Sequence, residues 1–134
     1  LLAQVPKRLL AVRAFADMPE SDALAAANKR IGNILKKSAN EAQAVEPRLI
    51  VEPAEIALYD AMETVAKLAD AAFEAGNYTA SLQALAALRA PVDAFFDNVM
   101  VNAEDVAIRA NRLGLLSQLH ATMNRVADLS KLAS

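Results

Sequence analysis

The chain has 134 residues, of which 55% are hydrophobic and three are glycine, and it contains no cysteine. This composition favours a single closely packed domain over a disordered chain, and it excludes disulfides and thiolate metal sites. The net charge of −2 is unevenly distributed: residues 1–50 balance to +3, residues 51–110 to −7 and residues 111–134 to +2. A surface that binds a polyanion is therefore expected in the first and last parts.

The sequence also bears on location and domain organisation. No run of about 18 uncharged apolar residues is present, so no membrane-spanning helix is predicted, and no signal peptide is visible. The lack of cysteine favours an intracellular compartment. The chain begins at Leu1 without a methionine. We interpret residues 1–134 as one domain excised from a longer chain, with residues 1–17 as the end of a preceding helical segment.

Two helices are predicted near residues 7–17 and 20–38, separated at Pro19. In the second, apolar residues occupy one side, and the opposite side carries four cations and an amide with no acid: Lys29, Arg30, Asn33, Lys36 and Lys37. Charge stripes are in general solvated faces. The alternative is a strip that contacts phosphates, because Lys and Arg carry the backbone part of nucleic-acid affinity.

Residues 39–52 have the composition of a linker, and a third helix is predicted near residues 53–75. It opens at Glu52-Pro53 and ends at Gly76, which suits a left-handed C-cap. Its exposed side carries Asp60, Glu63, Asp70 and Glu74. Because these carboxylates would repel phosphate, we interpret this helix as scaffold, or as a surface that faces another part of the protein.

The fourth predicted helix, near residues 78–98, has large apolar residues at helical spacing: Leu82, Leu85, Leu88, Val92, Phe95 and Val99. Pro91 interrupts the pattern, so a break or kink is expected there, with Pro91 in the first turn of a new helical piece. We predict that Phe95, Leu88, Leu116 and Val65 belong to the core.

The last helix is predicted near residues 103–127, with Asn102 as its N-cap and Asp105 completing a capping box. Arg112 falls in the middle of the apolar side of this helix. A buried guanidinium needs a paired carboxylate, and Asp97 or Asp93 on the preceding helix is the natural partner. We therefore favour a structural ion pair for Arg112 over an RNA contact.

The residue types needed for catalysis or metal binding do not come together in the sequence. Three glycines do not build a phosphate-binding loop, and His120 is the only histidine. Acid pairs such as Asp93 and Asp97 fit the surface of a helix better than a general acid and base. The sequence predicts no catalytic residue, no metal ligand and no cofactor site in this domain.

Four stretches carry a resemblance to a known family: ALAAANKRIGNILKK, ALAALRAPVDAFFDNVMV, ANRLGLLSQL and RVADLSKL. They closely resemble the C-terminal region of the bacterial glycyl-tRNA synthetase β subunit, which is an anticodon-binding domain of the DALR type. Domains of this type also occur in arginyl- and cysteinyl-tRNA synthetases. The matches span roughly residues 20–132. The expected fold is an all-α, single helical bundle of about five helices.

The resemblance implies tRNA binding, at the anticodon, as part of a cytoplasmic glycine–tRNA ligase. The synthetase α subunit and glycine tRNA are the implied partners, ATP and Mg are used by the whole enzyme, and neither DNA nor a membrane is expected. The resemblance favours the interpretation in which the exposed basic side of the second helix contacts phosphates. This basic stripe consists of Lys29, Arg30, Asn33, Lys36 and Lys37. Arg89 and Asn98, which flank the matched motif, become candidates for contacts to unstacked anticodon bases. The alternative is a helical protein–protein interaction domain that touches no RNA.

Overall fold

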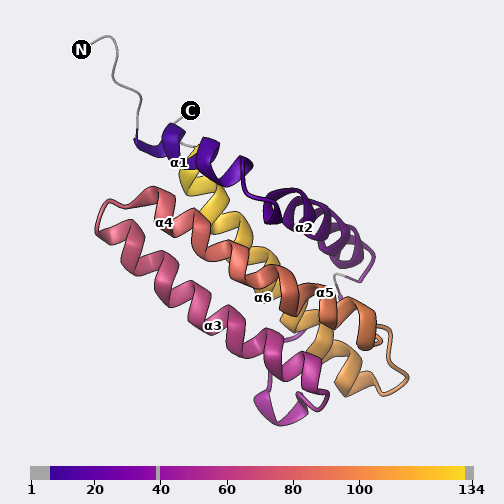
Figure 1. Cartoon of the computed structure of the whole chain (residues 1–134). Coiled ribbons are helices and arrows are strands. Elements are labelled where there is room, and N and C mark those ends of the chain that lie inside the picture. Colours follow the sequence, from indigo (N-terminus) through magenta and orange to yellow (C-terminus); the bar gives the residue numbers. More distant parts are fainter. Residues whose placement is uncertain (1–6, 39, 132–134) are drawn as a thin grey trace, which may run out of the picture.

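A computed structural model of the chain describes residues 7–38 and 40–131, and side-chain burial for residues 10, 13–38 and 40–125 (Figure 1). The described residues form helices and no strand, which confirms the all-α prediction. The elements in order are α1 (Lys7–Ala16), α2 (Glu20–Lys37), the 3-10 turn η1 (Pro47–Leu49), α3 (Pro53–Glu74), α4 (Tyr78–Gln83), the 3-10 segment η2 (Ala84–Leu88), α5 (Arg89–Asn98) and α6 (Val106–Lys131). No helix in this part of the chain is long and apolar enough to cross a bilayer.

The helices pack as a bundle around the α4–η2–α5 segment and α6 (Figure 1). Helix α3 runs antiparallel to the α4–η2–α5 segment and lies beside it. Helix α2 packs on α5, η2 and α6, and α1 packs on α4 and α6. The outer sides of α2 and α3 thus lie on different sides of the bundle.

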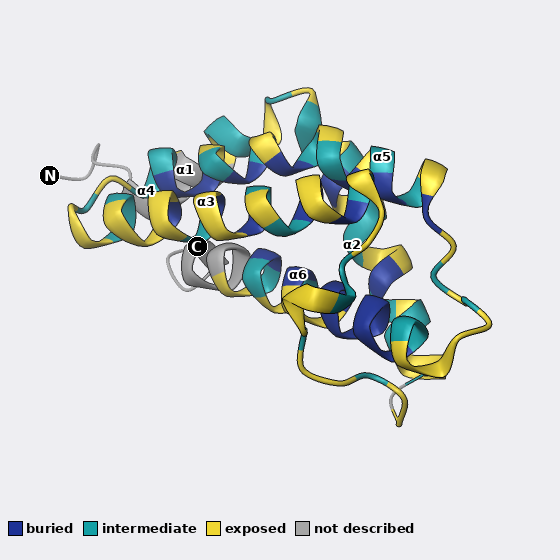
Figure 2. Cartoon of the chain, turned by 90° about the horizontal axis from the view of Figure 1, so that it is seen from below, coloured by how far each residue is buried: buried dark blue, intermediate teal, exposed yellow. Residues whose placement is uncertain are grey.

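The core lies where these helices meet. Phe95, Leu88 and Leu116 are fully buried and Val65 is 1% exposed, so the four predicted core residues are confirmed. All six predicted apolar positions from Leu82 to Val99 are buried as well. In α6, every residue from 110 to 116 is buried, which covers all sides of the helix (Figure 2). Polar residues in this stretch are therefore buried along with the apolar ones.

The two ends of α3 lie where the sequence predicts them, at Glu52-Pro53 and before Gly76. Glu52 and Glu55 make a reciprocal capping box at the start of α3, with Pro53 in the first turn. Gly76 follows α3 with φ of 78°, a left-handed conformation that costs glycine little. The side chain of Asn77 then caps α4 by accepting from the backbone N–H of Ala80 at 3.1 Å. The turn between α3 and α4 is thereby fixed from both sides.

Predicted boundaries are displaced in the fourth and the last helix, and the last helix ends at Lys131 rather than near residue 127. The backbone tightens into the 3-10 segment Ala84–Leu88, ahead of Pro91, whereas Pro91 lies in the first turn of α5 as expected. Because proline has no N–H, the chain changes helix type before it rather than at it. The last helix begins at Val106, not at residue 103, so the capping box with Asn102 is wrong. Asp105 is the cap, and its Oδ1 accepts from the N–H of Ile108 at 3.0 Å.

Candidate nucleic-acid interface

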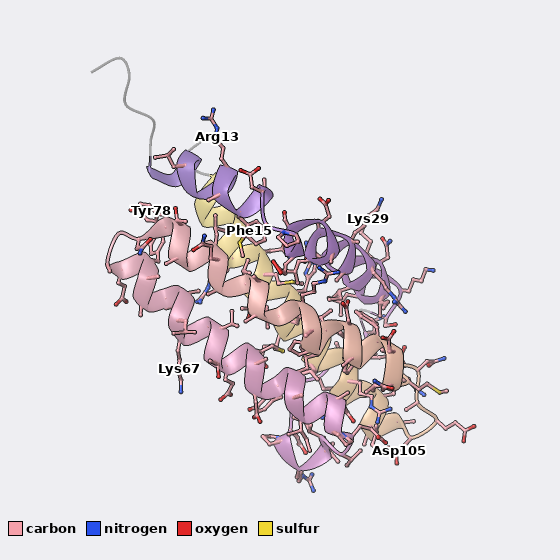
Figure 3. All side chains as sticks on the ribbon, viewed as in Figure 1. Arg13, Phe15, Lys29, Lys67, Tyr78 and Asp105 are labelled. Carbon is pink, nitrogen blue, oxygen red and sulfur yellow. The ribbon has the colours of Figure 1, made fainter. Side chains whose placement is uncertain are left out.

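The basic stripe of α2 lies on the surface, as its spacing predicts. Its five members are exposed: Lys29, Arg30, Asn33, Lys36 and Lys37. The opposite side of the helix holds it to the core through Leu24 and Ile31, which are 4% and 0% exposed. Lys29 projects away from the bundle, while Lys67 of α3 projects from a different side (Figure 3). The stripe is therefore a set of solvated charges on a rigidly anchored helix.

Four members of the stripe line one shallow depression of about 370 Å³: Lys29, Arg30, Asn33 and Lys37. Ala26 and Ile34 complete its lining, and no acidic side chain contributes to it. Lys36 is exposed but does not line it. A concave surface with three cations and an amide attracts phosphate by charge and offers it several hydrogen-bond donors.

Phe96 of α5 packs against one member of the stripe, Arg30. The guanidinium carbon of Arg30 lies 4.1 Å from the centroid of the Phe96 ring, a cation–π contact. Phe96 in turn meets the fully buried Phe95 edge to face, with ring centroids 5.6 Å apart. Arg30 is thus placed by a ring that the core itself holds. The two adjacent phenylalanines were visible in the sequence, but their contact with α2 depends on tertiary packing.

The other two candidates for RNA contact, Arg89 and Asn98, lie on α5 and do not line the depression. The amide Nδ2 of Asn98 donates to the carbonyl of Ala94 in its own helix at 2.9 Å. Arg89 Nε lies 3.7 Å from Asp93 Oδ2, one turn further on. Helical spacing puts Arg89 on the same face of α5 as Phe96, seven residues later, and Asn98 on another face.

Arg112 is buried and ion-paired, but not with the predicted partners. Its Nη2 lies 3.0 Å from Oε1 of Glu55 in α3, and its Nη1 donates to the carbonyl of Met100 at 2.7 Å. Asp97 and Asp93 are exposed on α5, so pairing with either was wrong. The reason is that α3 packs on α6 and brings its first turn to Arg112. The sequence carried a signal: Glu55 continues the apolar spacing of Leu58, Met62 and Val65.

The outer side of α3 is negative. Asp60, Glu63, Asp70 and Glu74 are all exposed, and Asp70 pairs with Arg125 of α6 at 2.5 Å. The Glu63 carboxylate, by hydrogen bonding and by its charge, raises the pKa of the Tyr59 phenol above 10. Lys67 is the one exposed cation of α3, so the four carboxylates leave this side with a net negative charge. A net negative side repels a polyanion.

The described residues contain no cluster of three or more His, Asp or Glu side chains that could hold a metal ion. His120 is half-buried on α6, beside Gly32 of α2: a Cβ placed on Gly32 would lie 3.4 Å from His120 Nε2. The imidazole therefore lies close to the backbone of α2 at Gly32. Its position fits a packing role at the rim of the core.

Comparison with known proteins agrees with the resemblance found in the sequence. Residues 24–132 match the family described as DALR anticodon binding domain. The chain is 68% identical over 134 residues to the glycine--tRNA ligase beta subunit of Dechloromonas aromatica, covering 99% of this chain and 19% of that protein. It is 67% identical over 131 residues to the protein of the same name from Thiobacillus denitrificans, covering 97% of this chain and 19% of that protein. The chain thus spans about a fifth of the length of these curated relatives. It belongs to the DALR anticodon-binding domain family.

Proposed function

We propose that this domain binds tRNA at its anticodon as part of the β subunit of a glycine–tRNA ligase. Membership of the anticodon-binding family and the shared name of the relatives support the proposal. In the structure, the observation that carries it is the exposed basic stripe of α2, which lines a concave surface free of acidic side chains.

In this proposal α2 holds the RNA chiefly through its phosphates. Side chains one turn apart on a helix lie about 5–6 Å from each other, so the cations form a fixed row along the surface. Lys29 and Lys37 contact phosphates as point charges, and Asn33 between them donates through its amide. Arg30, placed on Phe96, offers its guanidinium to an unstacked base or to a phosphate.

The aminoacylation chemistry, which uses ATP and Mg, is assigned in this proposal to the rest of the β subunit and to the α subunit, in the cytoplasm. This domain contributes tRNA affinity and discrimination between anticodons. It would act on catalysis only by holding the tRNA in the orientation that the catalytic part requires.

The proposal is tested by measuring tRNA affinity against salt concentration for the assembled enzyme. The variant is Lys29→Ala/Lys37→Ala, which removes two cations from the depression. Each lost phosphate contact lowers the slope of log affinity against log salt by about one unit, on all tRNA sequences alike. The matched control is Lys67→Ala, an exposed cation on α3. Unchanged slope and affinity in the double variant would place the RNA elsewhere on the domain.

A second function, docking on a partner protein, is favoured by the outer side of α3. Besides its carboxylates, this helix exposes 46% of Ile56 and 56% of Leu68. The two functions use different helices and do not exclude one another. Charge reversal at Asp60 and Glu63 should weaken docking and leave the salt dependence of tRNA binding unchanged. If this variant instead lost the salt dependence of tRNA binding, a docking role for this side of α3 would be contradicted.

A further inference from the structure

A second, smaller cavity lies beside the basic depression, past the end of α2. Its volume is about 170 Å³, and its apolar lining consists of Ile34, Val101 and Leu113. Ile34 also lines the depression, so the two hollows share a wall. Val101 belongs to the loop between α5 and α6, and Leu113 is a buried residue of α6. The cavity is therefore formed where α2, this loop and α6 meet.

Polar groups surround this apolar lining. Ser38 and Asn102 line the cavity, and neither side chain forms a hydrogen bond within the described part of the chain. Glu41 and Arg109 line it as an ion pair, with Nε and Oε1 2.9 Å apart. Arg109 also donates from Nη1 to the carbonyl of Ala103 at 3.0 Å. Arg109 thus joins the segment after α2 to the loop after α5.

The size and chemistry of the cavity fit one flat, polar-edged ring. At about 30 Å³ for each water in the liquid, its volume is that of roughly five or six waters, well below the 300–1,000 Å³ of drug-sized pockets. The apolar side chains suit the face of such a ring. The hydroxyl of Ser38 and the amide of Asn102 each donate and accept hydrogen bonds, as the edge of a base requires.

We propose that this cavity binds one unstacked nucleobase of single-ring size, from the RNA whose phosphates lie on α2. The inference rests on the proposed function and adds the place where a base is read. Ser38 and Asn102 hydrogen-bond the edge of the base, and Ile34 lies against it. Arg109 acts as a positioning residue that holds the two sides of the cavity together. The neighbouring depression supplies the cations that a base with its phosphates needs.

The test uses the assembled enzyme and glycine tRNA in which one anticodon-loop nucleotide at a time lacks its base. Wild type should lose affinity, roughly ten-fold, at the position whose base occupies the cavity. Ser38→Ala/Asn102→Ala should weaken binding of intact tRNA by a similar factor and show no further loss at that one position. The loss at other positions and the salt slope should stay as in wild type. Gln83→Ala, an exposed amide on α4, is the matched control and should change nothing.

A second variant separates base reading from a structural effect. Asn102→Asp replaces an amide, which donates and accepts, by a carboxylate that only accepts. At the sensitive position it should shift the preference towards a base with an exocyclic amino group, such as cytosine, over uracil. A merely structural role would lower affinity for both bases equally, and that outcome would overturn the inference.

The outcomes distinguish this inference from the proposed function. Salt-dependent tRNA binding with additive losses at every position, or an unaffected Ser38→Ala/Asn102→Ala variant, would overturn the base cavity alone. Wild-type binding without salt dependence would overturn the proposed function and the base cavity together. If Ser38→Ala/Asn102→Ala shows no further loss of affinity when the base is removed at the sensitive position, the base cavity and the proposed function are both supported.

Discussion

Removing the guanidinium of Arg112 should destabilise the domain strongly, because it leaves a buried carboxylate without its counter-charge. The Arg112 side chain is 7% exposed and that of Glu55 is fully buried, with the charged atoms 3.0 Å apart. Glu55 Oε1 also accepts from the N–H of Glu52 at 3.1 Å, whereas Oε2 has no partner among the described residues. In Arg112→Met the capping hydrogen bond remains and the charge stays buried. Breaking such a pair from one side costs about 3–5 kcal/mol.

A second substitution, Glu55→Gln, completes a double-mutant cycle with Arg112→Met. Its effect on the free energy of unfolding should change sign between the wild-type and the Arg112→Met background. Glu55→Gln keeps an oxygen that can accept from Glu52 N–H but removes the charge. On its own it should destabilise, since Arg112 is then buried without a counter-ion. In the Arg112→Met background it should stabilise, because it removes the uncompensated charge. This reversal of sign follows only if the two groups interact directly.

The free energies of unfolding of wild type, the two single variants and the double variant are measured by thermal and denaturant unfolding. For a domain of this size, 3–5 kcal/mol corresponds to a fall in Tm of roughly 10–20 °C. Arg125→Met on the same helix is the control: its pair with Asp70 is more than half exposed on both sides, so a loss below about 1 kcal/mol is expected. A loss of that small size for Arg112→Met, or further destabilisation when Glu55→Gln is added to it, would refute the reasoning.

Three further substitutions test the packing of the fold. Phe95→Ala removes a fully buried ring and should cost about 3–5 kcal/mol in unfolding experiments; a loss below about 1 kcal/mol would show that the core closes around the gap. Gly114→Ala would place a Cβ 1.9 Å from the carbonyl oxygen of Gln43, so the segment after α2 must move; we expect a loss of about 1–3 kcal/mol and faster amide exchange at Glu46, which donates to Asn111. Gly76→Ala meets no atom within 4 Å but keeps a left-handed φ, so it should cost only roughly 1–2 kcal/mol, and a neutral result would show that the turn adjusts.

Most of the fold could be predicted from the sequence because buried helices have apolar residues at a regular spacing. The apolar spacing from Leu82 to Val99 predicted six buried positions, and the structure buries each of them. Local signals were equally direct where a single residue decides, as at Gly76. These features depend on interactions within a few residues, which is the range that a sequence pattern reports.

Choices between equivalent local signals could not be made from the sequence. Asn102 and Asp105 are both good N-caps, and the structure uses Asp105. The shorter helix leaves the chain from Val99 to Asp105 free to turn, so that carbonyls in this loop reach arginines of α6. The partner of Arg112 was missed for a different reason, its distance along the chain. Glu55 is 57 residues away, and only the packing of α3 on α6 brings the two together.

The two arginines of α6 show how the fold sets the geometry of the proposed base cavity. Arg109 and Arg112 lie about one turn apart, donate to the carbonyls of Ala103 and Met100, and pair with Glu41 and Glu55. In the sequence, Asn102 lies between Met100 and Ala103, whose carbonyls accept these two hydrogen bonds. The position of Asn102 therefore depends on both arginines. The Arg109 pair is 25% and 47% exposed, so solvent screens it and it adds little stability. Removing one partner of the buried Arg112 pair therefore costs far more stability than removing one partner of the Arg109 pair, which orients the loop against the segment after α2.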